Sequence, residues 1–302
     1  MVSQWIFNLT ISKENAEQPL RGLLSSSWRL PRHLIGSLRR NNRVLVNGKY
    51  LPMNFLVHED DQVNLTFLPT DFSKPFPNVI SDSSFTPEIL YEDNNLVVVN
   101  KRQGDKTHPN QPGEKGATIN FLAAYLKTKS TLPYMVHRLD QMTSGAMIFA
   151  KNPAVVPILV NNLQTKRIYR IYLAWVHGDD FPSSGIINEP IGRDPEDKRK
   201  RMVNGLNALR AITNYKVVKR IAGFSLVKIK LDTGRTHQIR VHFSFKGRPL
   251  VGDPLYSNDL RIQPMLLHSW QIRFPLPFSQ ETKEVTATLP KRFTDFERKI
   301  NR

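Results

Sequence analysis

The sequence predicts an α+β protein, and three observations support this fold class. Stretches with the pattern of strands outnumber those with the pattern of helices, and few alternate strictly with helices, which disfavours a doubly wound α/β sheet. Residues 21–49 contain seven basic residues and no acidic one, whereas residues 72–87 are rich in Pro and Ser and lack periodicity. We therefore expect a basic module at residues 1–72, a linker at 73–87 and a larger domain at 88–302.

The composition limits the classes of protein to consider. The chain has 302 residues, 40% of them hydrophobic, which is enough for a folded core. Its 43 Lys and Arg residues exceed its 26 Asp and Glu residues, and the formal charge is +17. This surplus indicates an anionic partner, with nucleic acid first and a membrane surface second. No apolar run approaches the roughly 18 residues of a spanning helix, so we expect no membrane anchor.

The cysteine content and the first residues bear on the compartment. The chain contains no cysteine, which excludes disulfide bonds and zinc sites built on thiolates. The start, MVSQWIFNLTISKE, lacks the basic and apolar blocks of a signal peptide. We therefore expect a cytoplasmic protein. Because neither a heptad pattern nor an apolar surface stripe is present, we also expect a monomer.

The basic module begins with the pattern of a strand followed by a short helix. Trp5, Phe7, Leu9 and Ile11 occupy every second position, as in a strand with one buried face. Residues 31–42, PRHLIGSLRRNN, have the apolar spacing of a helix, with arginines on its other sides.

A strand and a tight turn follow at residues 43–51, RVLVNGKYL, where Asn47-Gly48 supplies the positive φ angles that a hairpin turn requires. Residues 61–68, DQVNLTFL, predict a second strand. The basic helix followed by a V-x-VNGK turn resembles the small S-four RNA-binding module, although a generic basic α+β lobe is the alternative. The resemblance implies an RNA-binding surface made of Arg32, Arg39, Arg40, Arg43 and Lys49.

The elements of the larger domain are predicted from their apolar patterns. One helix is a special case: Asn152 can cap the stretch NPAVVPILVNNL, but Pro157 lacks the amide that an interior turn needs. We therefore expect this helix to be kinked or to start late. The other elements are strands at residues 94–102, 167–178 and 225–235 and a helix at residues 118–127.

Two polar clusters are unusual within this domain. The first, HRLDQMTSG at residues 137–145, is a polar turn that leads into an apolar strand. Tyr172 lies between the clusters, on the strand face opposite Leu173. The second cluster follows a Thr-Gly turn and places five polar residues within eight positions: Arg235, His237, Gln238, Arg240 and His242.

Taken singly, these residues have ordinary structural interpretations. Asp140 is the type of carboxylate that caps a turn by accepting backbone amides. Tyr172 is typical of a half-buried strand aromatic, and His137 and Arg138 are typical of solvated loops. The two arginines of the second cluster are the type of residue that contacts phosphates.

Other chemistries find little support. His237 and His242 are five residues apart, which does not align two zinc ligands on a helix, so we expect no metal site. Ser144 lies outside a G-x-S-x-G elbow, which argues against a serine hydrolase. A glycoside hydrolase normally needs a pair of acids, and no second acid stands out near Asp140.

Taken together, the motifs resemble those of the RluA family of pseudouridine synthases, from about residue 88 to the C-terminus. The motifs are HRLDxxTSG before an apolar strand, YLAWVHG, TGRTHQIRVH with GRPLVGDPLY, and LLHSW. Upstream, KRQGDKTHP resembles a K-P-x-G-x-x-x-H-P element, but Arg102 stands where proline is usual. Arg170 occupies a position where the family more often has lysine.

The resemblance implies a catalytic domain with a mixed, mainly antiparallel sheet and a central cleft. Such enzymes detach uracil from its ribose within RNA, rotate it and rejoin it through carbon, without a cofactor or metal. The implied partner is RNA, with ribosomal large-subunit RNA favoured and transfer RNA as the other option. A non-catalytic RNA-binding or ribosome-assembly protein on the same fold is the alternative, although binding alone gains nothing from a carboxylate in the first motif.

By the same resemblance, Asp140 is the catalytic carboxylate, Tyr172 lies against the target base, and Arg235 pairs with Asp140. A neighbouring guanidinium typically lowers the pKa of a carboxyl by about 1–3, whereas burial raises it. We therefore expect Arg235 to keep the carboxylate charged and aimed when RNA excludes water. Arg138 is expected to help to extrude the target nucleotide. The expected substrate-binding residues are His137, Arg138, Thr143, His237, Gln238 and Arg240.

Overall fold

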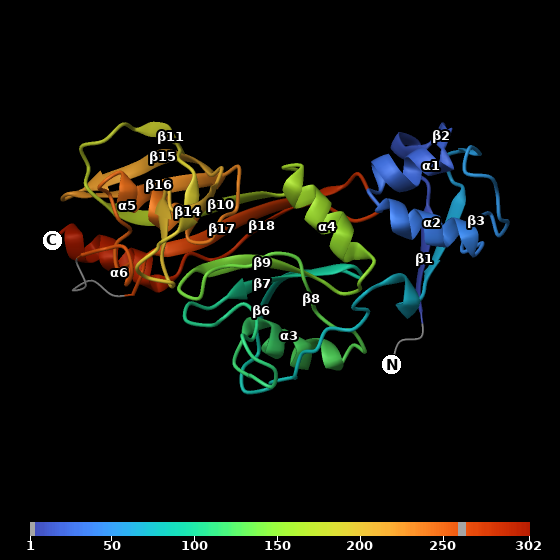
Figure 1. The fold of residues 1–302 in the computed structure, drawn as a ribbon, viewed down its shortest axis with the longest axis horizontal. Coiled ribbons are helices and arrows are strands. Elements are labelled where there is room, and N and C mark those ends of the chain that lie inside the picture. Colours follow the sequence, from blue (N-terminus) through green and yellow to red (C-terminus); the bar gives the residue numbers. More distant parts are fainter. Residues whose placement is uncertain (1–3, 259–263) are drawn as a thin grey trace.

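The structure is a computed structural model that describes residues 4–258 and 264–302. Figure 1 shows a small part at one end of the molecule and a larger part in which long strands form a sheet. Within the described ranges, no helix combines the length and the apolar character of a membrane-spanning segment.

The small part contains a three-stranded antiparallel sheet in the order β1-β5-β3, and the short strands β2 and β4 pair beside it. Its strands are β1 Trp5–Thr10, β2 Gln18–Pro19, β3 Val44–Val46, β4 Leu56–Val57 and β5 Gln62–Phe67. Its helical segments are η1 Lys13–Asn15, α1 Leu20–Gly22, η2 Leu23–Ser27, α2 Arg32–Arg40 and η3 Pro69–Asp71.

Helix α2 and the turn after β3 confirm two predictions for the module. Leu34 and Leu38 lie on the buried face of α2, and its arginines lie on the exposed sides. Asn47 has a φ of 51° and Gly48 a φ of 76°, so both adopt the left-handed backbone that a tight hairpin turn requires.

The larger part is built on a ten-stranded sheet whose main path runs β11-β15-β16-β10-β17-β9-β7-β6. Strand β18 pairs with β17, and β8 pairs with β9. The described pairs are antiparallel except for β9 with β17, which confirms the α+β class with a mixed, mainly antiparallel sheet.

The strands of this sheet have the following bounds: β6 Glu88–Glu92, β7 Leu96–Lys101, β8 Tyr134–Met135, β9 Ser144–Ala150, β10 Tyr169–His177, β11 Ser184–Asn188, β15 Ile212–Ile221, β16 Phe224–Leu231, β17 Leu267–Pro275 and β18 Thr282–Thr286. A separate three-stranded sheet in the order β13-β12-β14 is formed by β12 Ile191–Arg193, β13 Arg201–Val203 and β14 Leu206–Leu209.

The parallel pair brings two sequence motifs together at the centre of the sheet. Ser144 lies opposite His268, and Gly145 lies opposite Ser269. Gly145 has a φ of +114°, and a Cβ at this position would lie 2.2 Å from the carbonyl oxygen of Ser269. Glycine is therefore required where the polar turn enters β9.

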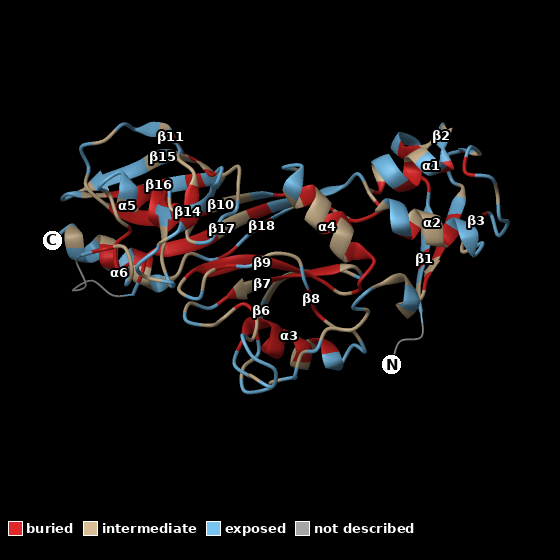
Figure 2. Ribbon diagram, viewed as in Figure 1, coloured by how far each residue is buried: buried red, intermediate tan, exposed pale blue. Residues whose placement is uncertain are grey.

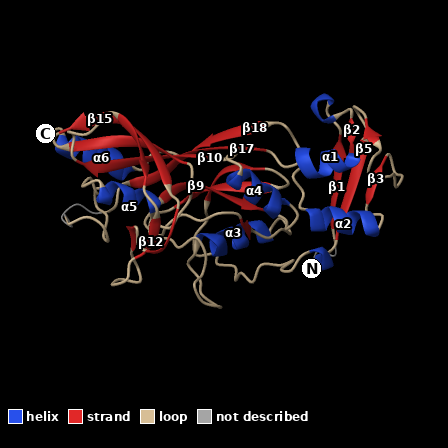
Figure 3. Ribbon diagram, turned by 45° about the horizontal axis from the view of Figure 1, so that its top comes forward, coloured by secondary structure: helices blue, strands red, loops and turns tan. Residues whose placement is uncertain are grey.

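In the part of the chain that the structure describes, four helices pack on the large sheet: α3 Thr118–Lys127, α4 Val155–Gln164, α5 Gln238–Phe245 and α6 Lys291–Ile300. Figure 3 shows α3 and α4 on the side nearer the small part and α5 and α6 toward the far end. Of the two options for α4, the late start is the one observed, because the helix begins at Val155. Pro157 then falls in its first turn, where no amide is needed, and Asn152 accepts the Val155 amide at 3.0 Å.

Buried residues follow the central strands, which are mostly coloured as buried in Figure 2. The two faces of β7 illustrate the arrangement: Leu96 and Val98 belong to one hydrophobic cluster, and Val97 and Val99 belong to another. Because both faces of the sheet are covered, this strand reads as a continuous apolar run rather than an alternating one.

The small part is attached to the larger part by side-chain contacts as well as by the chain. Phe278, in the turn between β17 and β18, lies with its ring centroid 4.9 Å from that of Phe7 and 5.6 Å from that of Trp28. The three side chains are 8%, 9% and 2% exposed, respectively, and one hydrophobic cluster contains residues of both parts. Arg29 donates to Asn161 at 3.2 Å across the same contact.

Candidate active site

The two polar clusters of the sequence meet in one cavity of about 90 Å³. The turn before β9 supplies one wall, and the residues around the start of α5 supply another. Strand β10 contributes Arg170 and Tyr172, and β17 contributes Leu267. The remaining lining residues are Arg138, Leu139, Asp140, Thr143, Leu231, Gly234, Arg235, Thr236, His237, Gln238, Ile239 and Arg240.

Asp140 faces two nitrogen groups from the start of α5. Its Oδ2 lies 3.7 Å from Nη1 of Arg240 and 4.0 Å from Nε2 of His237. The Asp140 side chain is 18% exposed, so the carboxylate is open to the cavity. The turn itself is closed by the Thr143 amide, which donates to the Asp140 carbonyl at 3.0 Å.

The expected pairing of Asp140 with Arg235 is not the one that the structure shows. Arg235 is exposed at the mouth of the cavity, and its Nε donates to the carbonyl of Arg210 at 3.0 Å. The reason is the position of the helix: Arg235 precedes α5, whereas Arg240 lies in its first turn on the buried side. Arg240 therefore makes the contact that was assigned to Arg235.

A buried carboxylate holds Arg240 in place. The Nε and Nη2 atoms of Arg240 each lie 2.8 Å from an oxygen of Asp253, which leaves Nη1 of Arg240 directed at Asp140. Burial alone would lower the pKa of Arg240, but the hydrogen bonds and charge of Asp253, with a smaller contribution from Asp140, raise it. The guanidinium is thus a fixed positive charge beside Asp140.

Tyr172 approaches the same cavity from β10. Its side chain is 4% exposed, and the residue lies opposite Ser269 in the pairing of β10 with β17. Burial raises the pKa of the Tyr172 hydroxyl, while the charge of Arg170 opposes this shift. The phenol therefore stays protonated at neutral pH and can act as a hydrogen-bond donor at the cavity wall.

Two of the predicted substrate-binding residues have structural roles instead. His137 is not among the lining residues, and its Nε2 accepts the Ile148 amide at 3.1 Å. Burial, and then the charge of Arg170, lowers the pKa of His137 to about 3. Gln238 lines the cavity, but its side-chain amide makes four hydrogen bonds within the protein. Its Oε1 accepts from Thr233 Oγ1 and the Arg235 amide, and its Nε2 donates to the Ile212 carbonyl and Thr213 Oγ1. No hydrogen-bonding group of Gln238 is then free for a substrate.

Sequence reasoning missed two residues that support the site. Lys101 is buried, and its Nζ donates to the carbonyl oxygens of Arg102, Gln141 and Thr143 at 2.9, 3.1 and 2.9 Å. Burial lowers the pKa of Lys101 to about 8. Tyr256 contacts His237 with its hydroxyl. Both residues lie inside motifs used for the family resemblance, but their spacing along the chain does not reveal these contacts.

The basic residues of the module divide into two groups. Arg43 is not available as an exposed cation, because its Nη1 and Nη2 bind the carboxylate of Asp71 at 2.7 and 2.8 Å. Burial alone would raise the pKa of Asp71, but hydrogen bonds from Arg43, Ser37 and the Leu68 amide lower it to about 2. The other four predicted RNA-binding residues, Arg32, Arg39, Arg40 and Lys49, are exposed.

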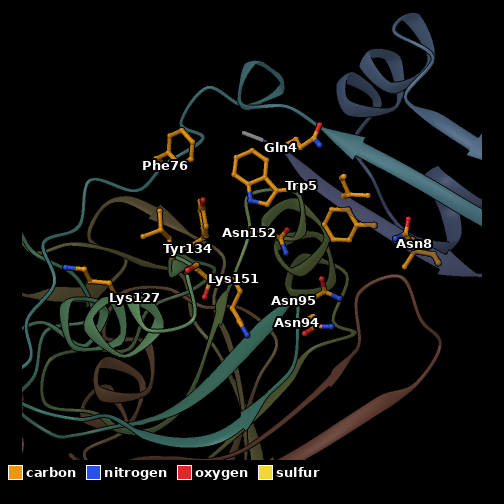
Figure 4. Close-up of a pocket in the computed structure, with 16 residues that line it drawn as sticks. Gln4, Trp5, Asn8, Phe76, Asn94, Asn95, Lys127, Tyr134, Lys151 and Asn152 are labelled. Carbon is orange, nitrogen blue, oxygen red and sulfur yellow. The ribbon is translucent and has the colours of Figure 1, made fainter. Parts of the chain in front are cut away.

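A larger cavity of about 910 Å³ lies elsewhere, between β1 and the larger part. Figure 4 shows Trp5, Phe76, Tyr134 and Lys151 around it. Lys151 directly follows the end of β9, whereas the turn that carries Asp140 precedes the start of this strand. The larger cavity is therefore separate from the two polar clusters. Among the described residues, no group of three or more His, Asp or Glu side chains is placed to hold a metal ion.

Comparison with known proteins gives consistent matches along the chain. Residues 95–245 match the model of the RNA pseudouridylate synthase family, and residues 7–63 match that of the RluD ribosomal pseudouridine synthase N-terminal domain. The chain is 34% identical over 297 residues to the uncharacterized RNA pseudouridine synthase YlyB of Bacillus subtilis, with 94% of each chain covered.

Two further matches concern a named enzyme and a solved structure. The ribosomal large subunit pseudouridine synthase D of Neisseria meningitidis is 33% identical over 271 residues, which cover 83% of this chain and 70% of that protein. The structure of human RNA pseudouridylate synthase domain containing 4 superposes with a TM-score of 0.60 at 25% identity. That match covers 70% of this chain and 92% of the human one.

Proposed function

Because the chain belongs to the RNA pseudouridylate synthase family, we propose that it uses Asp140 to convert uridine to pseudouridine within RNA. In this isomerisation the bond from the ribose to a uracil nitrogen breaks, the base rotates, and the ribose is rejoined to carbon-5. The hydrogen on carbon-5 leaves as a proton, and the freed ring nitrogen takes a proton up. No other reactant is consumed.

The observation that carries the proposal is the position of Asp140. Its carboxylate opens into a cavity, with Arg240 at 3.7 Å and the phenol of Tyr172 in the cavity wall. When RNA enters and water leaves, Arg240 stabilises the charged carboxylate and fixes its orientation, which is the role first expected of Arg235. Tyr172 then lies against the target base and transfers a proton in the later steps.

The rim of the cavity is suited to an RNA strand. Arg138, Arg170 and Arg235 all line it, and Arg138 and Arg235 are exposed. We assign Arg138 to extrusion of the target nucleotide, which costs a few kcal/mol, about what a small number of phosphate contacts can supply. Arg235 is assigned to the RNA backbone.

The proposed substrate is ribosomal large-subunit RNA, with transfer RNA as the alternative. The support is that two relatives, 31% and 33% identical and each matching 83% of this chain, carry the name ribosomal large subunit pseudouridine synthase D. We further propose that residues 1–72 are an RNA-binding domain acting through Arg32, Arg39, Arg40 and Lys49, that residues 73–87 are a linker, and that residues 88–302 are the catalytic domain. Tritium release from ribosomal and transfer RNA transcripts would separate the two substrates.

The catalytic proposal is tested with RNA carrying tritium at carbon-5 of uridine. The wild-type protein should release the label, and Asp140→Asn should release none while binding RNA with similar affinity. The matched control is Asp295→Asn, which removes a carboxylate that is 52% exposed and should leave release unchanged. Binding without release by the wild-type protein would instead favour a non-catalytic RNA-binding role.

A further inference from the structure

His237 has a backbone conformation that is unusual for its residue type. Its φ is 58° and its ψ is 18°, in the left-handed region, immediately before α5 begins. Such conformations are rare for residues with a Cβ and cluster at functional sites. Here the conformation places the two ring nitrogens of His237 between two partners: Nε2 lies 4.0 Å from Asp140 Oδ2, and Nδ1 lies 2.8 Å from the Tyr256 hydroxyl.

The hydrogen bonds of Tyr256 decide which nitrogen of His237 carries the proton. The Tyr256 oxygen already accepts the amide of Arg201 at 2.8 Å. If the hydroxyl donates to Nδ1, both the hydroxyl hydrogen and Nδ1 have a partner, and the imidazole proton lies on Nε2, facing the carboxylate of Asp140. The opposite tautomer would leave the Tyr256 hydroxyl hydrogen without this acceptor and would turn a lone pair toward the carboxylate.

Burial favours the neutral form of His237. Burial lowers the pKa of His237, and the charges of Arg240 and Arg201 lower it further. The carboxylates of Asp140 and Asp253 oppose this shift. A neutral imidazole has one N–H to give, so the tautomer controls whether Asp140 meets a donor or an acceptor.

Tyr256 also touches the other partner of Asp140. The guanidinium carbon of Arg240 lies 5.0 Å from the centroid of the Tyr256 ring, and the Tyr256 amide donates to Asp253 at 3.2 Å. The ring of Tyr256 lies edge-on to that of His237, with centroids 5.6 Å apart. Tyr256 therefore contacts both His237 and Arg240, the two residues that face the carboxylate of Asp140.

On the proposed function, in which Asp140 is catalytic, we propose that Tyr256 and His237 form a positioning pair for this carboxylate. The Tyr256 hydroxyl holds the imidazole in the tautomer with its proton on Nε2, and this N–H closes onto Asp140 Oδ2 when RNA fills the cavity. The 4.0 Å separation in the free protein is longer than a hydrogen bond. Catalytic contacts commonly tighten only in the substrate complex.

The first test is Tyr256→Phe, which removes one oxygen atom and keeps the ring. The single-turnover rate at saturating RNA should fall about tenfold, the factor that corresponds to ~1.4 kcal/mol of transition-state stabilisation. The dissociation constant for RNA should stay within about twofold, because the hydroxyl contacts none of the basic side chains assigned to the RNA backbone. Tyr215→Phe is the matched control: this tyrosine packs against Phe181 and Phe243, outside the residues that line the cavity.

The second test reads the tautomer directly in the free protein. The ¹⁵N shifts of the His237 ring should show a proton on Nε2 in the wild type and a shift toward the Nδ1 form in Tyr256→Phe. This readout needs no turnover, so it separates the inference from the proposed function. An inactive Asp140→Asn together with a normal rate or an unchanged tautomer in Tyr256→Phe would overturn the positioning pair alone.

A double-variant cycle completes the test. His237→Asn removes the imidazole but keeps a residue type that tolerates positive φ. If the two residues act through one contact, the double variant should be no slower than the slower single variant. Independent, multiplicative losses of rate would contradict the proposal.

Discussion

Arg240 and Asp253 form a bidentate ion pair in which two guanidinium nitrogens each lie 2.8 Å from a carboxylate oxygen. The side chains are 3% and 0% exposed, so the pair is sealed from water. Asp253 also accepts the amides of Leu255 and Tyr256. The remaining nitrogen, Nη1, is thereby presented to Asp140, and the stability of the fold and the geometry of the cavity depend on the same pair.

Removing the carboxylate of this pair should destabilise the protein strongly. Asp253→Asn leaves a buried guanidinium with a weaker partner, and the loss of one member of a buried ion pair typically costs about 3–5 kcal/mol of unfolding free energy. Urea denaturation at pH 7 would measure it. Asp197→Asn, which breaks the surface pair of Asp197 with Arg199, should give no measurable change. Equal effects of the two substitutions would contradict the role given to the buried pair.

Substitutions of Arg240 and Arg235, the two arginines of the second cluster, should have different effects on the rate and on RNA affinity. Arg240→Lys keeps the charge but loses the fork that binds Asp253 and faces Asp140, so the single-turnover rate should fall by about 10²-fold with RNA affinity nearly unchanged. Arg235→Lys, at the exposed mouth, should keep the rate at saturating RNA. Filter binding at several salt concentrations, together with single-turnover kinetics, separates the two. The assignment would be wrong if Arg235→Lys slowed turnover more than Arg240→Lys.

The buried histidines predict how stability depends on pH. Burial, followed by the charge of Arg292, lowers the pKa of His268 to about 4. His268 takes up a proton near pH 6.5 in the unfolded chain but stays neutral in the folded protein until about pH 4. Its contribution to the free energy of unfolding is therefore present above pH 6.5 and is lost as the pH falls toward 4. The loss between pH 7 and 5 is about 2 kcal/mol for a histidine that stays neutral when folded.

Urea titrations at pH 7, 6 and 5 would measure this slope. His268→Gln should make it shallower by about that amount, because the variant has no group to titrate there. The exposed His33 on α2 offers the matched control, since His33→Gln should leave the slope unchanged. A slope that does not respond to His268→Gln would show that folding does not lower the pKa of His268.

Phe278 should contribute to global stability although it lies in a turn. Phe278→Ala removes a buried ring between Phe7 and Trp28, and such truncations typically cost about 3–5 kcal/mol. The thermal midpoint should fall, and limited proteolysis should cut residues 73–87 faster. Phe245→Ala, at a side chain that is 51% exposed, is the control with little expected effect. Unchanged proteolysis would show that the two parts are held together by other contacts.

The elements that carry the site could be predicted from local patterns, but the contacts between them could not. The turn with Asp140 and the strand with Tyr172 follow from polar and apolar spacing, and both residues line the cavity. The choice between Arg235 and Arg240 depends on where α5 begins, and no residue pattern placed a helix start after His237. The sequence predicts an RNA contact for Arg43 because its actual partner, Asp71, lies 28 residues away and no local pattern reveals the pair.

The contact made by Phe278 has a consequence for substrate choice. A module tethered only by its linker could reach many sites on an RNA, whereas one locked against the catalytic part keeps a single separation from Asp140. An RNA that binds both the module and the cavity must then have its target uridine at one fixed distance from the segment bound by the module. By fixing this distance, the turn between β17 and β18 would select among uridines that have the same local sequence.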